Sequence, residues 1–243
     1  AIGTRLSSHI VRKFGMTGLR EDHISVRLRG TAGQSLGAFA TQGLRLEVIG
    51  DANDYVGKGL SGGTIIVRPS AAASFVAHEN TIIGNTVLYG ATSGRLFAAG
   101  QAGERLCVRN SGATAVVEGA GTNACEYMTG GRVVILGEVG DNFGAGMTGG
   151  MGFVYDPNET FISRVNPASL QVVRIGTAHW EAELKALIEA HAAATDSALA
   201  ARLLNEWDVE IGKFWHVVPT EIVARLEMPL ADDAAAAGGA TLA

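Results

Sequence analysis

Glycine recurs at a fixed interval in the middle of this chain, and the repeat constrains the fold more than any other feature. The stretch from Gly43 to Gly152 holds 23 of the 33 glycines. Within it, three rows step along the chain by 18 or 19 residues: Gly94, Gly112, Gly131 and Gly150; Gly84, Gly103, Gly121 and Gly140; Gly100, Gly119 and Gly137. Three rows in phase at this period indicate a repeat architecture.

Short apolar runs follow the glycines of the first row, at residues 96–99, 115–117, 133–136 and 153–154. Runs of about four residues bounded by glycine are typical of buried strands rather than helices. Because so short a unit cannot bury its apolar face alone, neighbouring units must stack as in a solenoid, with parallel strands and glycine at the corners. The sequence therefore predicts a mainly β protein, a single-stranded parallel β-helix with glycine corners.

Two ladders of side chains follow from this register. Hydroxyl groups fall at one corner of successive turns, where they can bond backbone groups freed by the bend: Thr92, Ser111, Thr129 and Thr148. Cys107 and Cys125 are 18 residues apart and should face the same way on adjacent turns. That spacing is within reach of a disulfide, although two small buried thiols in an apolar stack are the simpler interpretation.

Composition excludes several classes of function. The net charge of −5 and the pI of about 5.7 leave no basic field to attract nucleic acid or a membrane surface. The two cysteines are too few for a disulfide framework, a zinc site or an iron–sulfur cluster, and they suit a reducing, cytoplasmic compartment. No apolar run is long enough to span a bilayer, and no signal peptide is recognisable. Since residues 1–14 have the character of mid-chain sequence, we expect a piece of a longer polypeptide.

The flanking segments have other periods. Residues 4–14 have the apolar spacing of a helix that ends at Gly15, and residues from His23 alternate as in half-buried strands. Beyond Pro157, the spacing predicts a helix around residues 180–191, a second at 198–207, a docked apolar segment at 214–219 and a helical turn at 222–226. We therefore divide the chain into an N-terminal helix and linker (1–22), the β-helix (23–157), a small α-helical C-terminal appendage packed on it (158–230) and a disordered tail (231–243).

One loop invites a binding interpretation. Gly57-Lys58-Gly59 could cradle a phosphate through backbone N–H groups and an ammonium group. However, the spacing fits neither common nucleotide-binding fingerprint, and residues 144–150 repeat the pattern without the lysine, which favours a structural corner. His78 and Glu79 lie in a loop that interrupts the repeat, where a histidine is usually just solvated. The sequence thus predicts no catalytic, cofactor-binding or metal-binding residue.

The remaining candidates are structural. Fourteen glycines are assigned to the repeat itself: Gly57, Gly59, Gly62, Gly63, Gly94, Gly103, Gly112, Gly121, Gly131, Gly140, Gly144, Gly146, Gly149 and Gly150. Some of the charged residues within the turns are expected to pair across neighbouring turns, at a gain of about 0–1 kcal/mol a pair. These charged residues are Glu104, Arg105, Arg109, Glu118, Glu126, Arg132, Glu138 and Asp141.

Several longer motifs point to a family. Residues 50–63 resemble the GXGXG domain of glutamate synthase, and so do residues 33–35, 84–85, 88–92, 102–105, 108–112 and 125–128. The resemblance extends from about residue 4 to about residue 226 and is to the C-terminal portion of the large (α) subunit. It implies a right-handed β-helix.

The resemblance also implies a parent enzyme that makes glutamate from glutamine, 2-oxoglutarate and reducing equivalents. In such a parent, a glutaminase domain with an N-terminal cysteine releases ammonia, and a synthase domain holds FMN and a 3Fe–4S cluster. An NADPH-dependent form adds a small (β) subunit with FAD and 4Fe–4S clusters, whereas other forms take electrons from ferredoxin. The β-helix is implied to be a non-catalytic scaffold that holds the glutaminase and synthase domains together.

Other classes remain as alternatives. A stand-alone acyltransferase of the hexapeptide-repeat kind would place an aliphatic residue every six positions, whereas glycine dominates these turns. A polysaccharide lyase or hydrolase would need carboxylates and aromatic subsites along a groove, and aromatic residues are only 6% of this chain. A scaffold subunit of another redox complex also carries the GXGXG pattern, but the helical end from Trp180 favours glutamate synthase. The open ends of the coil predict some self-association of the chain alone.

Overall fold

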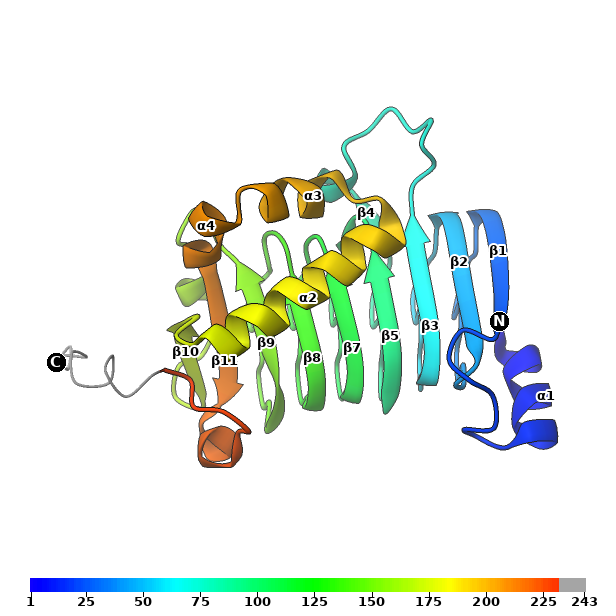
Figure 1. Ribbon diagram of the computed structural model, residues 1–243, viewed down its shortest axis with the longest axis horizontal. Coiled ribbons are helices and arrows are strands. Elements are labelled where there is room, and N and C mark those ends of the chain that lie inside the picture. Colours follow the sequence, from blue (N-terminus) through cyan, green and yellow to red (C-terminus); the bar gives the residue numbers. More distant parts are fainter. Residues whose placement is uncertain (232–243) are drawn as a thin grey trace, which may run out of the picture.

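Seven parallel strands stacked side by side form the body of the molecule (Figure 1). The computed structural model describes residues 1–231. Each strand pairs in parallel with the next, in the order β1 (Ile24–Thr31), β2 (Leu44–Asp51), β3 (Ser61–Arg68), β5 (Ser93–Ala98), β7 (Ser111–Val117), β8 (Thr129–Ile135) and β9 (Gly149–Tyr155). The predicted parallel β-helix is therefore confirmed.

The other walls of the coil are shorter. β4 (Thr81–Ile83) pairs in parallel with β6 (Gln101–Ala102), and isolated bridges join Ala102 to Ala120 and Ala120 to Val139 in the following turns. At another corner, the hydroxyls of Thr92 and Ser111 donate to backbone carbonyls of the preceding turn at 3.4 and 3.2 Å, which confirms that part of the hydroxyl ladder.

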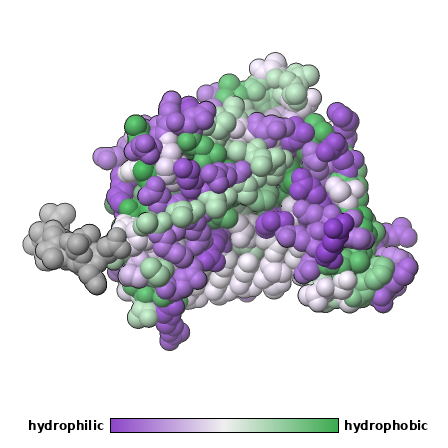
Figure 2. Space-filling model, viewed as in Figure 1, coloured by the Kyte–Doolittle hydropathy of each residue, from purple (hydrophilic) through white to green (hydrophobic). Residues whose placement is uncertain are grey.

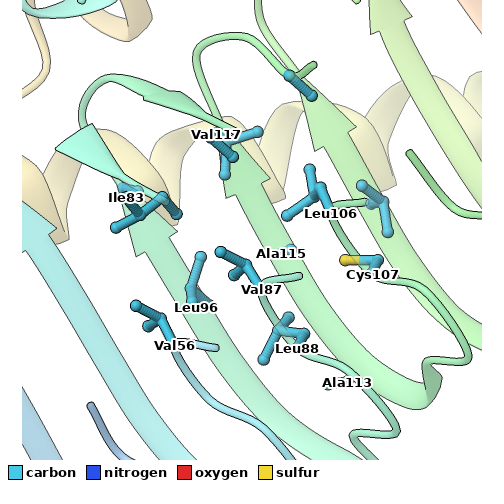
Figure 3. Close-up of a cluster of buried hydrophobic side chains, with 14 of the residues drawn as sticks. Val56, Ile83, Val87, Leu88, Leu96, Leu106, Cys107, Ala113, Ala115 and Val117 are labelled. Carbon is cyan, nitrogen blue, oxygen red and sulfur yellow. The ribbon is translucent and has the colours of Figure 1, made fainter. Parts of the chain in front are cut away.

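Side chains from all walls point into the coil and form its core. Figure 3 shows Val87 and Leu88 from one wall facing Leu96 on β5, and all three are completely buried. Cys107 and Cys125 lie in the same core, and both thiols are buried and free, as the simpler interpretation predicted. Because burial disfavours the charged thiolate, it raises the pKa of both thiols.

A second apolar layer covers the outer face of the sheet. α2 (Ala178–Thr195) lies across β3, β5, β7 and β8 in Figure 1, followed by α3 (Ala198–Asn205) and α4 (Trp207–Glu210). Trp180, Leu184 and Ile188 of α2 pack in one cluster with outward-pointing residues of the sheet such as Phe97 and Val134. Because both faces of these strands are covered, successive residues are apolar rather than alternate ones. The helices expected around residues 180–191 and 198–207 are confirmed.

The C-terminal segment is not only helical. Residues 214–219, expected to dock as an apolar segment, form β11 (Phe214–Pro219), which is antiparallel to β9, and β10 (Leu170–Arg174) pairs with β11 in turn. Because β11 runs antiparallel to β9, it does not continue the parallel coil, and β9 is the last strand of the coil. Ala231, assigned above to the tail, bridges Gly176. The rest of that tail, residues 232–243, lies outside the described residues.

Four short 3₁₀ helices complete the secondary structure of residues 1–231: η1 (Ala77–Glu79), η2 (Phe161–Arg164), η3 (Ile211–Lys213) and η4 (Thr220–Arg225). The last of these matches the helical turn expected at residues 222–226. No helix in this part of the chain is both long and apolar enough to cross a membrane.

α1 (Thr4–Phe14) caps one end of the coil and ends at Gly15, as predicted. Ser7 Oγ accepts a hydrogen bond from the backbone N–H of Thr41 at 3.0 Å. Farther along the coil, a carbonyl of the preceding turn accepts the equivalent bond, as Ala40 does for Ser61 at 2.9 Å. At this corner, the helix therefore takes the place of a preceding turn. Of its expected apolar face, Ile10 is buried, but Phe14 remains 43% exposed.

Candidate functional site

One corner of the coil is built from left-handed backbone, and both Gly-x-Gly loops belong to it. In six successive turns, alternate residues have φ near 60°; Cys107, for example, has a φ of 59°. Gly57 and Gly59 (φ 64° and 62°) take the same places two turns earlier, and Gly144 and Gly146 (φ 66° each) take them two turns later. The two loops are thus the same architectural position.

The amide groups of this corner already have partners. Gly57 N–H donates to the carbonyl of Leu36 and Gly59 N–H to that of Tyr89, both at 2.8 Å. The Lys58 ammonium lies 5.4 Å from the centre of the Tyr55 ring. A phosphate cradle needs several free N–H groups that converge. The amides of Gly57 and Gly59 are not available for one.

Other glycines lie where neighbouring turns approach closely. Gly84, Gly103, Gly121 and Gly140 stack on one another, and a Cβ on Gly140 would lie 2.5 Å from the backbone nitrogen of Thr122. Gly62, Gly63, Gly94, Gly149 and Gly150 lie near the starts of β3, β5 and β9 against the preceding turn.

The first glycine row is displaced by one residue in one turn. A Cβ on Gly131 would lie 2.3 Å from the carbonyl oxygen of Ala113, whereas Gly112 lies against Thr92. Ala113, rather than Gly112, therefore shares a column with Gly131. The cause is a register shift between Ser111 and Thr114 in the pairing of β7 with β8, which equal spacing in the sequence does not reveal.

Ion pairs across neighbouring turns occur at Glu47, which pairs with Arg27 and Arg68, but not among the eight charged residues predicted to pair. Arg132 forms ion pairs with Glu183 and with Glu227, and Arg164 pairs with Asp141 at 3.2 Å. None of the ion pairs within residues 1–231 joins two of the eight residues named above, so the predicted pairing among them is wrong. The C-terminal segment lies over the outside of the turns and supplies the opposite charges.

A buried polar cluster joins β7 to the helices, and no spacing or motif in the sequence predicted it. Glu118 follows β7 and is 2% exposed, and His191 on α2 is completely buried. Glu118 Oε1 accepts a hydrogen bond from Ser197 Oγ and lies 3.4 Å from His191 Nε2. Glu118 Oε2 and His191 Nδ1 have no hydrogen-bond partner in the part of the chain that the structure describes. The available signal was a carboxylate directly after the apolar pair Val116–Val117.

These residue types occur in hydrolases, but the arrangement differs from a nucleophilic triad. In a triad, histidine contacts the serine hydroxyl and the carboxylate orients the histidine. Here the carboxylate of Glu118 accepts a hydrogen bond from the hydroxyl of Ser197, and that hydroxyl accepts a second one from the N–H of Ala200 at 3.0 Å. The cluster therefore fastens the start of α3 to the coil.

A cleft of about 430 Å³ lies next to this cluster, between the coil and α3. Its lining includes His78, Glu79, Glu118, Tyr155 and Arg202, so the loop histidine of the sequence analysis faces it. Burial and a 2.5 Å hydrogen bond to Glu210 raise the pKa of the Tyr155 phenol. Burial opposes ionisation of Glu210, but hydrogen bonds from Tyr155 and Lys213 lower its pKa overall. Tyr155 therefore stays a hydrogen-bond donor that holds the end of α4.

Two further groups complete the candidates. Burial lowers the pKa of His216 to about 4, and neither of its ring nitrogens has a hydrogen-bond partner among residues 1–231. His179, Glu183 and Glu227 place possible metal-ligating atoms within 4.8 Å of one another. However, Arg132 already pairs with both carboxylates, and its positive charge opposes a cation at that place.

Comparisons with known proteins agree with these features. A family model described as the GXGXG motif matches residues 1–220. The chain is 65% identical over 230 residues to the glutamate synthase [NADPH] large chain of Azospirillum brasilense, which covers 95% of this chain and 15% of the relative. It is 51% identical over 218 residues to the ferredoxin-dependent glutamate synthase of Pyropia yezoensis, covering 90% of this chain and 14% of the relative.

A third relative, glutamate synthase [NADH] of Schizosaccharomyces pombe, is 49% identical over 226 residues, which is 93% of this chain and 11% of the relative. The chain thus spans about one seventh or less of the length of these relatives. It corresponds to one domain of much longer proteins. The family model matches residues 1–220, and the chain has a parallel β-helix fold. This chain therefore belongs to the GXGXG family.

Proposed function

We propose that this chain is the scaffold domain of a glutamate synthase, where it holds the glutaminase domain and the FMN and iron–sulfur synthase domain in a working relation. The observation that carries the proposal is its 65% identity to a glutamate synthase large chain over 95% of its length. The higher identity to the NADPH form than to the ferredoxin form favours a parent that uses NADPH and a small subunit.

The polar groups of the structure support a non-catalytic role. The amides of the Gly57–Gly59 corner bond neighbouring turns, and Glu118 and Ser197 fasten α3. Both arginines that line the cleft are committed in the same way, because Arg202 pairs with Glu210 at 3.3 Å and Arg164 with Asp141 at 3.2 Å. These groups position segments of the chain, and the predicted glycines set the spacing of the turns.

The cysteines of this domain do not fit the iron–sulfur clusters of the proposed parent. An iron–sulfur cluster needs several cysteine thiolates, and the two cysteines here are buried in the apolar core of the coil. We therefore assign the clusters to other parts of the parent, and we propose that FMN binds there too. Two free thiols also suit a reducing compartment, and we propose a cytoplasmic location.

A reconstitution assay tests the proposal. The large chain of the A. brasilense relative is truncated before the equivalent of residue 4, and glutamate formation is measured with glutamine and, separately, with ammonia. We expect the truncated chain to keep some ammonia-dependent activity and to recover glutamine-dependent activity when the folded fragment is added. The heat-unfolded fragment is the control.

Two results would contradict the scaffold role. Coupling of glutamine to glutamate formation could be intact without the fragment, which would leave the domain a role in folding or assembly only. Alternatively, the purified fragment alone could turn over glutamine or form glutamate, which would make it an enzyme in its own right.

A further inference from the structure

The two edges of the large sheet differ. One edge is β10, a strand of five residues that lies next to β11 in the sheet and is antiparallel to it. The other edge is β1, which has eight residues and, within residues 1–231, pairs only with β2. In Figure 1, no strand lies beyond it at the right-hand end of the molecule. Proteins usually keep bare edge strands short or covered, so β1 is an unusual edge.

The backbone groups on the outer side of β1 can be identified from its register. The N–H of Ile24 donates to the carbonyl of Gly43, and the N–H of Ala32 donates to the carbonyl of Asp51, both at 2.8 Å. The backbone N–H and C=O groups of the even-numbered residues therefore point toward β2. In a parallel pair, the N–H and C=O of one residue point to the same side and the side alternates along the strand. Ser25, Arg27, Arg29 and Thr31 therefore direct their N–H and C=O groups away from the sheet. The capping bonds of α1 go to residues 37–41 and reach none of these groups.

The apolar side of β1 is also incomplete. Ile24, Val26 and Leu28 pack against the core but are only half-buried. Their partners on β2 are at most 1% exposed. One more strand beyond β1 would satisfy the outer backbone groups and cover these side chains at the same time.

The positive charge near β1 indicates what kind of strand would bind beside it. Residues 1–29 contain six Arg or Lys and two acidic residues, in a chain whose net charge is −5. Arg27 pairs with Glu47 on β2 at 3.0 Å but remains 63% exposed, and Arg29 is exposed beside it on the same strand. Figure 2 shows hydrophilic surface along the right-hand end, next to apolar surface near α1. A symmetric pair of chains meeting at β1 would bring like charges together, whereas an acidic strand would be attracted.

We propose that the free edge of β1 binds an extended, acidic segment of the longer polypeptide as an additional strand. Main-chain hydrogen bonds would hold the segment in place, and its side chains would cover Val26 and Leu28 while facing Arg27 and Arg29. The chain spans only 15% of its A. brasilense relative, so ample polypeptide exists to supply the segment. The inference rests on the proposed function only in taking its partner from the same protein.

Peptide binding with hydrogen exchange tests this inference. Peptides of about 15 residues, long enough to span a strand, are tiled across the A. brasilense large chain outside the matched region. Each is added to the 243-residue chain, and amide exchange is followed by NMR. We expect an acidic peptide to slow exchange at Ser25, Arg27, Arg29 and Thr31. Val26 and Leu28, already bonded to β2, should change little and show that the chain is folded.

Matched variants separate edge pairing from general attraction. N-methylation of alternate amides in the binding peptide should abolish binding. Arg29→Glu should weaken it about fivefold, the scale of one exposed charge pair. Arg225→Glu makes the same charge change on η4 and should have no effect.

Two outcomes would overturn the inference. The four amides could stay unprotected with every acidic peptide, or they could already be protected in a dimer of the chain alone, which would make a second copy the occupant. Neither readout requires enzyme activity. A failure here therefore differs from a failure of the reconstitution assay, which concerns coupling between active sites.

Discussion

Positions 140 and 90 each require glycine, but for different physical reasons. A Cβ on Gly140 would lie 2.5 Å from the backbone of the neighbouring turn, and its φ is not in the left-handed region. Gly90 has a φ of 62°, but nothing lies within 4 Å of the place where its Cβ would be. The first position excludes a side chain by space and the second by backbone conformation.

These two positions give the first prediction. Gly140→Ala should lower the free energy of unfolding by about 3 kcal/mol, because backbone atoms of two turns must separate. Gly90→Ala should cost about 1 to 2 kcal/mol, the penalty for alanine in left-handed conformation. Urea denaturation of both variants measures the difference. Equal losses would mean that the turns can move apart easily and that close stacking is not the constraint at Gly140.

His216 gives the second prediction, a dependence of stability on pH. Its buried ring stacks on Phe153 with centroids 4.6 Å apart, and burial lowers its pKa to about 4. The unfolded chain has a histidine pKa near 6.5. As pH falls from about 6.5 to about 4, the unfolded state therefore binds a proton that the folded state does not, and stability is lost by up to about 3 kcal/mol.

His216→Leu should remove this part of the pH dependence. The difference in unfolding free energy between wild type and variant, measured in urea from pH 7 to pH 4, should change steadily over that range. His9→Leu replaces an exposed histidine on α1 and serves as the control. If both variants keep the slope of the wild type, the His216 ring is protonated in the folded state and its burial does not control it.

At the scale of elements, local signals predicted the helices but not the last two strands. Thr177 and Ser197 cap α2 and α3 by accepting the N–H of Trp180 and Ala200, and Asp196 ends α2 at a φ of 57°. Such capping residues are visible in the sequence. β11 has no such signal, because Phe214–Pro219 lacks a clear period and its partner β9 lies far earlier in the chain.

The buried cluster was hidden for a similar reason. Glu118 and Ser197 are 79 residues apart, and they meet only because α2 docks across the sheet. The repeat predicted where Glu118 lies in its turn but not that a helix covers that face. Long-range docking of the C-terminal segment, rather than local pattern, decides which charged residues of the coil are buried.

The third prediction concerns this junction. Ser197→Ala removes both the cap of α3 and a partner of buried Glu118, so the loss should be about 2 to 3 kcal/mol. Thr177→Ala removes only the cap of α2 and should cost about 1 kcal/mol. In a double-mutant cycle, Ser197→Ala with Glu118→Gln should cost less than the sum of the two single changes. Additive losses would show that Ser197 and Glu118 do not interact.

At the scale of the whole molecule, the coil is a stack in which each turn contacts mainly its neighbours. α2 changes this for part of the stack, because it contacts β3, β5, β7 and β8. β1 and β2 lie outside its reach and rely on α1 and on β3 for their support. The middle of the coil is therefore held together by α2, whereas the end at β1 lacks this support and should open more easily.

Native-state hydrogen exchange should reveal this division. Amides of β5, β7 and β8 are expected to exchange only through global unfolding, whereas those of β1 should exchange through local opening at a lower free energy. Opening β1 breaks one strand interface, whereas opening β7 breaks two and also separates α2 from the sheet. Trp180→Ala, which empties a fully buried position on α2, should cost about 3 to 5 kcal/mol. It should lower protection under the helix and leave β1 unchanged. Uniform protection from β1 to β9 would instead mean that α1 holds its end of the coil as firmly as α2 holds the middle.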